Sequence, residues 1–383
     1  MEMRWSMSIT ADVIIIGSGV VGNAAAYYLA KRGRKVIVLE AEDHIGHGGS
    51  SRNGGGVRQS GRDSRELPYA IYGIKNIWPT LSEELGEDVE YHQGGNLRLA
   101  LNEEHIKILQ GYTKRAQECG LEVEMVDAAT VKEICPHLSD EIVGASWCPT
   151  DGHANPMKTT LAFYKRGREM GVHYITGEKV VKIKTYRGRA RTIITENGTI
   201  YEAHDIVVAA GYESRFITKT VGIDIPMTRF YEECVVTEMQ PKMFDIMLGV
   251  ATGAVYGHQC DHGSFVFGSN TGLEKTLLFD HGKNKSNSLN ASANCRNIMQ
   301  YVPKLKDAKI VRTWGGWMDI GADGVPVIDE IDEVPGLFVA CAMSGHGFGT
   351  GPAVGYMLSQ MVDGEETVCD IEPLRYDRFK SLR

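Results

Sequence analysis

The chain has 383 residues, of which 43% are apolar and 23% charged, and this predicts an ordinary globular protein of two or three domains. Its formal charge of −8, with no basic run to offset it, argues against binding to nucleic acid or to an anionic membrane surface. Eight scattered cysteines without a C-x-x-C pair favour reduced thiols in a cytoplasmic protein and give no support to zinc or redox motifs.

No targeting or membrane segment is expected. Residues 1–10 contain no apolar stretch long enough for a signal peptide. No apolar run in the sequence is long enough to span a membrane, so we expect no transmembrane segment.

The first predicted elements form a strand–turn–helix–strand unit, with strands at 13–16 and 35–39 and a helix at 20–32. The turn carries a G-x-G-x-x-G pattern at Gly17, Gly19 and Gly22. Such glycines permit the tight turn, the approach of a pyrophosphate and close helix packing. Glu40 follows the second strand, where a carboxylate accepts ribose hydroxyls. The unit therefore predicts dinucleotide binding.

A loop rich in glycine, serine and arginine follows at 46–62. Its N–H groups, hydroxyls and cations suit a pyrophosphate or a polarised ring, and the alternative interpretation is a flexible surface loop.

The middle of the chain mixes helices and strands. Helices are predicted at 75–85, 103–120, 155–171 and 291–301. Strands are predicted at 96–101, 172–177, 206–209, 233–239, 263–269 and 336–340, with two more at 180–195 around the Arg187-Gly188 turn. The region 222–310 is rich in strands.

The last predicted unit is the strand at 336–340, a glycine-rich turn at 344–352 and a helix at 352–362. Pro352 is expected in the first turn of that helix, where its missing N–H has no cost. His346 in the turn is a candidate for proton transfer or for a hydrogen bond to a ring.

Three short apolar strands end in glycine turns, at 13–17, 206–211 and 337–345. Because parallel strands commonly bind ligands at their carboxyl ends, these segments predict one nucleotide-binding domain that grips a large cofactor. The fold class is therefore α/β, a Rossmann-like domain built from discontinuous segments. The inserted substrate domain is α+β, on a mixed or antiparallel sheet.

Other chemistry has less support. There is no Ser/His/Asp order and no G-x-S-x-G elbow for acyl transfer. His44, His47, His258 and His262 lack the spacing of a metal motif, so no metal is expected. Trp314 and Trp317 either line a pocket or belong to the core.

Several motifs together resemble the FAD-dependent superfamily of D-amino-acid oxidase, glycine oxidase and sarcosine oxidase. Besides the fingerprint with Glu40, these motifs are 50–58, 151–156, 209–211, Arg312-x-Trp-x-Gly316, Asp323-Gly324-x-Pro326 and 344–347. The run 51–68 is most similar to catalytic subunits of multi-subunit opine oxidase, hydrogen cyanide synthase and dye-linked proline dehydrogenase.

The resemblance implies that FAD is the cofactor and that a C–N bond is oxidised by hydride transfer to flavin N5, after which the imine hydrolyses. It implies an FAD-binding domain at 10–90, 150–220 and 311–383, and a substrate domain at 91–149 and 221–310. The implied cofactor-binding residues are Gly17, Gly19, Val20, Val21, Gly22, Glu40, Ala41, Ser50, Ser51, Arg52, Asn53, Gly54, Gly55, Val180, Ala210, Gly211, Gly345, His346, Gly347, Phe348, Gly349 and Thr350.

The sequence departs from the resemblance around the substrate. Met318 and Gly349 stand where relatives carry a carboxylate-binding arginine and a lysine, and Gly316 stands near the position of a flavin-linking cysteine. No covalent flavin link of that kind is expected. The remaining candidates for the catalytic site are Arg58, Tyr256, His258, Asp319 and His346.

Three functions follow from this sequence. The first is a dehydrogenase of a small amino or imino acid, or of a secondary amine, which passes electrons to partner subunits carrying FMN, FAD or an iron–sulfur centre. The second is a stand-alone oxidase that releases peroxide. The third, of another class, is a flavin-binding assembly or electron-carrier protein without its own turnover.

Overall fold

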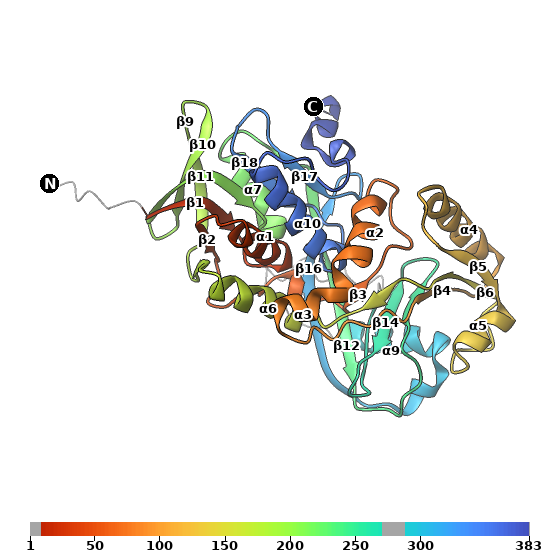
Figure 1. The fold of residues 1–383 in the computed structure, drawn as a ribbon. Coiled ribbons are helices and arrows are strands. Elements are labelled where there is room, and N and C mark those ends of the chain that lie inside the picture. The colour runs from red at the N-terminus through yellow and green to blue at the C-terminus, as the bar shows by residue number, and fades with distance from the viewer. Residues whose placement is uncertain (1–8, 270–287, 383) are drawn as a thin grey trace.

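The computed structural model describes residues 9–269 and 288–382 (Figure 1). The expectation for a leader falls on residues 1–10, most of which lie outside this range. Two eight-stranded sheets organise the described part of the chain, and they lie on opposite sides of the view in Figure 1.

The first sheet brings together the three predicted strands that end in glycine turns. Its main path has the order β17 (Val327–Glu330), β18 (Leu337–Cys341), β11 (Ile200–Val208), β1 (Ile9–Ile16), β2 (Val36–Leu39) and β8 (His173–Ile175). The pairs from β18 to β8 are parallel, and β17 is antiparallel to β18. The predicted adjacency of these three segments is confirmed. A hairpin extends the sheet beside β11, formed by β9 (Val180–Tyr186) and β10 (Arg189–Thr195).

Both faces of this sheet are buried, as its continuous apolar strands require. Val13 and Ile15 belong to one hydrophobic cluster, and Ile14 and Ile16 belong to another on the opposite face. The helices whose residues join the first cluster are α1 (Val20–Lys31), α2 (Leu67–Asn76), α3 (Leu81–Leu85), α6 (Pro156–Glu169) and α10 (Gly347–Val362). The short helix α7 (Ser214–Lys219) packs on the second.

Helices α1 and α10 lie side by side because glycines line their contact (Figure 1). A Cβ at Gly351 would lie 2.7 Å from a methyl of Val20, and one at Gly355 would lie 2.4 Å from the Cβ of Ala24. This close approach brings the N-terminal turns of both helices to the same edge of the sheet, where β1 and β18 end.

The second sheet is mostly antiparallel. Its order is β16 (Ile310–Gly321), β12 (Met227–Thr237), β15 (Phe265–Ser269), β14 (Val255–Gln259), β13 (Met247–Val250), β4 (Asn96–Ala100), β6 (Gly144–Cys148) and β5 (Glu124–Asp127). Only the β13–β4 pair among them is parallel. The helices of this part are α4 (Glu103–Glu118), α5 (Ala128–Ile134) and α9 (Ser288–Tyr301). The sheets found confirm the predicted fold class.

Two predicted helices are wrong in detail. The expected helix at 75–85 is interrupted: α2 ends at Asn76, a short 3-10 turn covers Trp78–Thr80, and α3 follows. Pro79 lies in that turn and has no N–H to continue the ladder. Helix α10 begins at Gly347, so Pro352 lies inside the helix and not in its first turn.

The position of strand β16 in the second sheet differs from the predicted division into domains. Residues 311–383 were expected in the cofactor domain, whereas β16 pairs along its length with β12 in the second sheet. The division into domains stays a prediction. A two-stranded antiparallel ladder pairs β3 (Gly56–Val57), in the glycine-rich loop, with β7 (Gly152–His153).

Candidate functional site

The turn between β1 and α1 has the shape that its glycines predict. Gly17 has φ +103°, and a Cβ at Gly22 would lie 2.1 Å from the carbonyl oxygen of Gly17. Gly19 precedes the first turn of α1 in extended conformation. Only hydrogen fits at Gly17 and Gly22, which keeps the turn tight and places the N-terminus of α1, a site that favours a phosphate, directly after β1.

Glu40 is held at the end of β2. Its Oε2 accepts hydrogen bonds from the amide of Ser18 at 2.9 Å and from the hydroxyl of Ser18 at 2.5 Å. Its Oε1 accepts from the amide of Glu42 at 3.0 Å. The carboxylate is half-buried and lies beside the glycine turn, as recognition of a ribose requires.

Other predicted residues lie around this edge. The exposed Ala41 follows Glu40, and the amide of Glu178, two residues before Val180, donates to the carbonyl of Glu40. Ala210 and Gly211 start the turn after β11. A Cβ at Gly17 would lie 2.5 Å from the carbonyl oxygen of Ala209, so the first two glycine turns are in contact.

The loop at 46–58 continues from this turn toward the second sheet. The hydroxyl of Ser50 accepts from the amide of Val20 at 2.8 Å, which ties the loop to the start of α1. Asn53 Oδ1 accepts from the amide of Gly55. Gly54 packs against the ring of Tyr256, since a Cβ there would come within 2.5 Å of the ring.

Arg52 fastens this loop to β16. Its Nε donates to the carbonyl of His47 at 2.9 Å, and Nη1 reaches the carbonyl of Gly315 at 3.4 Å. Trp314 Nε1 donates to the carbonyl of Arg52 at 3.1 Å. A Cβ at Gly316 would lie 2.7 Å from the Cβ of Arg52, so a side chain there would displace the loop.

The turn before α10 is strained. Ala342 has φ +58° and Ser344 has φ +51°, and both are residues with a Cβ. Such conformations cluster at functional sites because the surroundings have to hold them in place. His346 follows as the residue before α10, and its Nδ1 lies 2.8 Å from Oε2 of Glu66.

Gly349 in the first turn of α10 contacts the loop at 46–58. A Cβ at this position would lie 2.8 Å from the carbonyl oxygen of Gly56 and 3.1 Å from the Cα of Val57. The predicted cofactor residues Phe348 and Thr350 are buried beside it, and Thr350 Oγ1 donates to the carbonyl of His346.

Three arginines gather around the far end of the same loop. Arg58 is half-buried, whereas Arg62 and Arg98 are 5% and 8% exposed. Arg62 Nε donates to the carbonyl of Arg58 at 2.6 Å, and Arg98 Nη1 lies 3.5 Å from the carbonyl of Ser60. Within the described residues, Arg58 Nε, Arg62 Nη1 and Arg98 Nε have no hydrogen-bond partner.

Arg62 has Glu66 Oε2 at 3.6 Å, whereas the charges of Arg58 and Arg98 are poorly balanced. Burial and the neighbouring charges of Arg98 and Arg62 lower the pKa of Arg58 to about 10. The fully buried Asp151 accepts hydrogen bonds from neutral donors, on Gln59, Ser60 and Asn96. An anion is therefore the ligand that this cluster favours.

The other predicted catalytic residues differ in surroundings. Tyr256 contacts Gly54, and its hydroxyl lies 3.4 Å from Cys234 Sγ. His258 is buried and stacks on His153 at 4.0 Å between ring centroids, and burial lowers its pKa to about 4. A neutral, stacked imidazole does not supply a cation at pH 7.

Asp319 contacts the strained turn. Its carbonyl accepts from the amide of Ser344 at 2.8 Å, and burial raises the pKa of its carboxyl to about 6, opposed by backbone amides at Met343 and Ala342. These contacts indicate that Asp319 stabilises the turn before α10.

Sequence reasoning missed Glu66, Arg62 and Arg98 as site residues. Arg62 stands in a Gly-Arg-Asp run at the end of the glycine-rich loop, and its burial could have been suspected there. Glu66 pairs with a residue 280 positions away, and no local pattern indicates such a contact.

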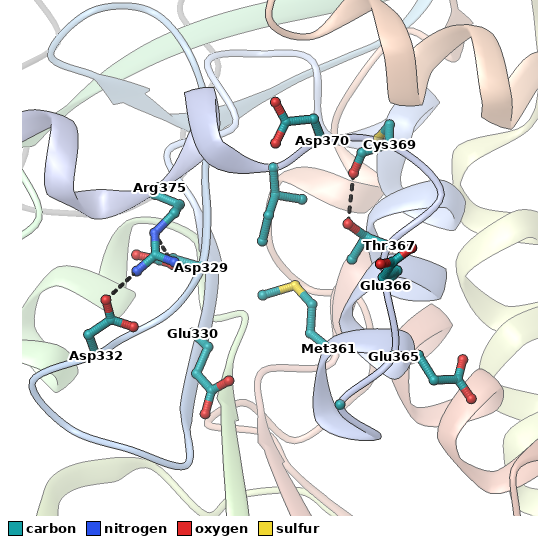
Figure 2. Close-up of a pocket in the computed structure, with 12 residues that line it drawn as sticks. Asp329, Glu330, Asp332, Met361, Glu365, Glu366, Thr367, Cys369, Asp370 and Arg375 are labelled. Carbon is teal, nitrogen blue, oxygen red and sulfur yellow. Dashed lines mark hydrogen bonds and ion pairs between the residues drawn. The ribbon is translucent and has the colours of Figure 1, made fainter.

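A pocket of about 470 Å³ lies elsewhere, between the C-terminal end of α10 and the C-terminal segment (Figure 2). Six carboxylates and Arg375 are among its lining residues, and none of the predicted site residues is. Among the residues that the structure describes, no group of three or more His, Cys, Asp and Glu side chains is placed to hold a metal. No helix of the described ranges is both long and apolar enough to cross a bilayer.

The comparisons with known proteins agree with this geometry. Residues 12–361 match the family model described as DAO, FAD dependent oxidoreductase. The chain is 27% identical to the opine oxidase B chain of Rhizobium meliloti over 87% of its length and 89% of that protein. It is 26% identical to the beta chain of sarcosine oxidase from an Arthrobacter species, over 97% of its length and 91% of that protein.

Solved structures show the same fold. L-proline dehydrogenase from P. horikoshii superposes with a TM-score of 0.89 at 27% identity, over 98% of this chain and all of that one. Glycine oxidase from Geobacillus kaustophilus superposes with a TM-score of 0.87 at 22% identity, over 96% and 99% of the two chains.

Proposed function

The chain belongs to the DAO family of FAD-dependent oxidoreductases, and from this premise we propose that it oxidises the C–N bond of an amine that bears a carboxylate. It is an FAD enzyme that acts on CH–NH or CH–NH2 donors. The proposal adds the substrate class, which is an amino acid or an N-substituted or cyclic amino acid.

The residues of the chain fit FAD. A side chain at Gly17 or Gly22 would clash with the backbone, so the turn stays tight beside the N-terminus of α1, and Glu40 lies where a ribose would be recognised. We assign the pyrophosphate to the N-terminus of α1 and the flavin to the region where the loop at 46–58 approaches Gly349. When bound, FAD supplies the acceptor for a hydride.

Arg58 is the observation that carries the substrate class. It is half-buried and its Nε has no hydrogen-bond partner among the described residues. It lies between the cofactor loop and β13, since Gly56 is close both to Arg58 Nε and to Met247. A guanidinium held there binds a carboxylate and fixes the amine next to the flavin.

Reduction of the flavin tests the proposal. Under anaerobic conditions, the holoenzyme is mixed with a panel of small amino acids, N-alkyl amino acids and cyclic imino acids, together with their decarboxylated analogues. We expect at least one carboxylate-bearing amine to bleach the flavin absorbance while its decarboxylated analogue does not. An unchanged spectrum across the panel would contradict the proposal and favour the carrier function.

Substitution of Arg58 separates binding from chemistry. Loss of a hydrogen-bonded ion pair costs about 1.5–3 kcal/mol, so R58M should weaken substrate binding roughly 10- to 150-fold. The exposed Arg168 on α6 offers a matched control, and R168M should bind as the wild type does. Equal binding by R58M and R168M would exclude Arg58 as the carboxylate site.

We further propose that the chain is the catalytic component of a heteromeric dehydrogenase. The support is that two relatives of similar length are named as subunits of oxidases and that a structural relative is named a dehydrogenase. The purified chain should reduce a soluble dye faster than oxygen. Rapid peroxide formation by the chain alone would favour the stand-alone oxidase.

A further inference from the structure

His346 and Glu66 form a pair that links the start of α10 to the start of α2. His346 Nδ1 lies 2.8 Å from Glu66 Oε2. The Glu66 side chain is 1% exposed, whereas the His346 side chain is 26% exposed. The pair therefore has a buried carboxylate at one end and an accessible imidazole at the other.

Hydrogen bonds hold the backbone of His346 on both sides. The amide of His346 donates to the carbonyl of Met343 at 2.8 Å, and its own carbonyl accepts from Thr350 Oγ1 at 3.0 Å. The strained residues Ala342 and Ser344 shortly precede it. Strain of this kind is kept only where the surroundings determine the conformation.

The carboxylate of Glu66 has partners at one oxygen, Oε2, but, within the described residues, not at the other. Arg62 Nη1 lies 3.6 Å from Oε2, and the hydroxyl of Tyr69 lies 3.4 Å from it. Oε1 is buried and has no hydrogen-bond partner in the part of the chain that is described. Burial of the carboxylate costs free energy, and His346 and Arg62 offset this cost, so the imidazole is part of what keeps the charge at this position.

We propose that Glu66 is a positioning residue that holds His346 in the Nδ1–H tautomer, so that Nε2 accepts a proton from the ammonium group of the substrate. This inference rests on the proposed function. A carboxylate that accepts from Nδ1–H leaves the opposite nitrogen as an acceptor. It also stabilises the imidazolium that forms when Nε2 takes the proton.

The proton transfer to His346 converts the substrate ammonium into a neutral amine. An N–H bond of the substrate ammonium breaks, the proton goes to Nε2, and the electron pair stays on nitrogen. That pair forms the C=N bond while the hydrogen on carbon leaves with its own pair, for which FAD would supply the acceptor when bound. Water then adds to the imine.

The charges around His346 favour the neutral imidazole, which can accept a proton. Burial and the charges of Arg62 and Arg58 lower its pKa, and Glu66 opposes them. Burial raises the pKa of Glu66, but His346 and Arg62 outweigh this, so that the carboxyl ionises below its ordinary range. Tyr69 faces the same carboxylate, and Asp319 on β16 faces the turn before His346. Burial and the two guanidinium charges therefore favour the neutral imidazole.

The closing experiment measures the tautomer without any substrate. The holoenzyme is labelled with 15N-histidine, His346 is assigned with H346Q, and the ring nitrogens are followed by NMR from pH 5 to 9. We expect the Nδ1–H tautomer in the wild type. In E66Q we expect a mixture of tautomers and a lower pKa, because the carboxylate that raises the pKa is gone. An Nε2–H tautomer in the wild type would overturn the proposal, and so would identical spectra of wild type and E66Q.

Flavin reduction gives the second readout. With a substrate found by the anaerobic panel, the acid limb of the rate should move to lower pH in E66Q, and the rate should fall roughly 10- to 100-fold. R168M changes an exposed position on α6 and should leave both unchanged. E66D, which keeps the charge, should restore part of the rate. An acid limb that does not move would overturn the proposal. If no substrate reduces the flavin, the proposed function fails while the tautomer result still decides the role of Glu66.

Discussion

The buried carboxyl of Asp329 predicts a specific pH dependence of stability. Its side chain is 1% exposed and lines the pocket of Figure 2. Oδ2 accepts from the amide of Tyr376 at 3.0 Å, and Arg375 Nε lies 3.4 Å from Oδ1. Burial raises the pKa of Asp329 to about 7, and Arg375 opposes this only in part. The substitution D329N keeps an oxygen for the Tyr376 amide but cannot ionise.

The sign and the size follow from linkage. Below the ordinary pKa of 3.8, the carboxyl is protonated in both the folded and the unfolded chain, and its contribution to stability is fully present. Between about pH 4 and 7 the unfolded chain ionises first, so stability is lost as the pH rises. A shift of about three pKa units at about 1.36 kcal/mol each gives about 4 kcal/mol.

This free energy converts to a measurable change in Tm. An unfolding entropy of about 2.1 cal/mol/K per residue makes about 4 kcal/mol worth about 5 °C for a chain of this length. The Tm of the FAD-saturated wild type and of D329N is measured from pH 4 to 8. The difference, D329N minus wild type, should rise by about 5 °C over this range.

Asp332 provides the control for this measurement. It also pairs with Arg375, but its side chain is 65% exposed and its charge is only one of several that raise the pKa of Asp329, so the D332N difference should rise with pH far less than that of D329N. A constant offset in D329N from the altered contact with Arg375 cancels, because only the slope with pH is compared. Parallel curves for wild type and D329N would refute the reasoning.

Two further predictions concern glycines of the cofactor site. G22A places a Cβ 2.1 Å from a backbone oxygen, so its affinity for FAD should fall at least tenfold by fluorescence titration, whereas G111A on α4, where the new Cβ would lie 3.7 Å from the Arg115 side chain, should match the wild type. Equal affinities of G22A and the wild type would contradict the close helix packing. G349A pushes on the backbone of Gly56 and Val57, so the visible circular dichroism of the bound flavin should change, and an unchanged spectrum would show that the contact is loose.

The sequence predicted the elements whose pattern is local. Strands β1, β11 and β18 are apolar and end in glycine turns, which was enough to place them in one sheet. The first half of β11 was missed because only Tyr201 and Ala203 of its opening residues are buried, so that its apolar run begins at Ile206 in the sequence. A strand that pairs with a hairpin on one side shows alternation there and not a continuous run.

Helix α10 shows where local propensity fails. Four glycines and Pro352 in its first nine residues predict a loop, since both residue types disfavour helix. Tertiary packing overrides this, because Gly351 and Gly355 allow contact with Val20 and Ala24 that larger residues would prevent. The close packing of α1 and α10 therefore outweighs a propensity cost of about 1 kcal/mol per glycine.

The site was predictable as a set of segments but not as a set of contacts. Arg52 contacts Gly315, and His346 contacts Glu66, across separations of 263 and 280 residues. Such pairs depend on how the two sheets approach each other. The sequence offers only the residue types.

The position of Arg58 depends on the absence of a side chain at Gly349. The resemblance expects a substrate lysine here, but the carbonyl oxygen of Gly56 lies 2.8 Å from where its Cβ would stand. The absence of a side chain lets β3 lie directly on the first turn of α10. The same strand leads into Arg58, whose guanidinium lies near β13 and whose Nε has no hydrogen-bond partner among the described residues. A lysine at 349 would therefore displace the backbone of Gly56 and Val57, and Arg58 with it.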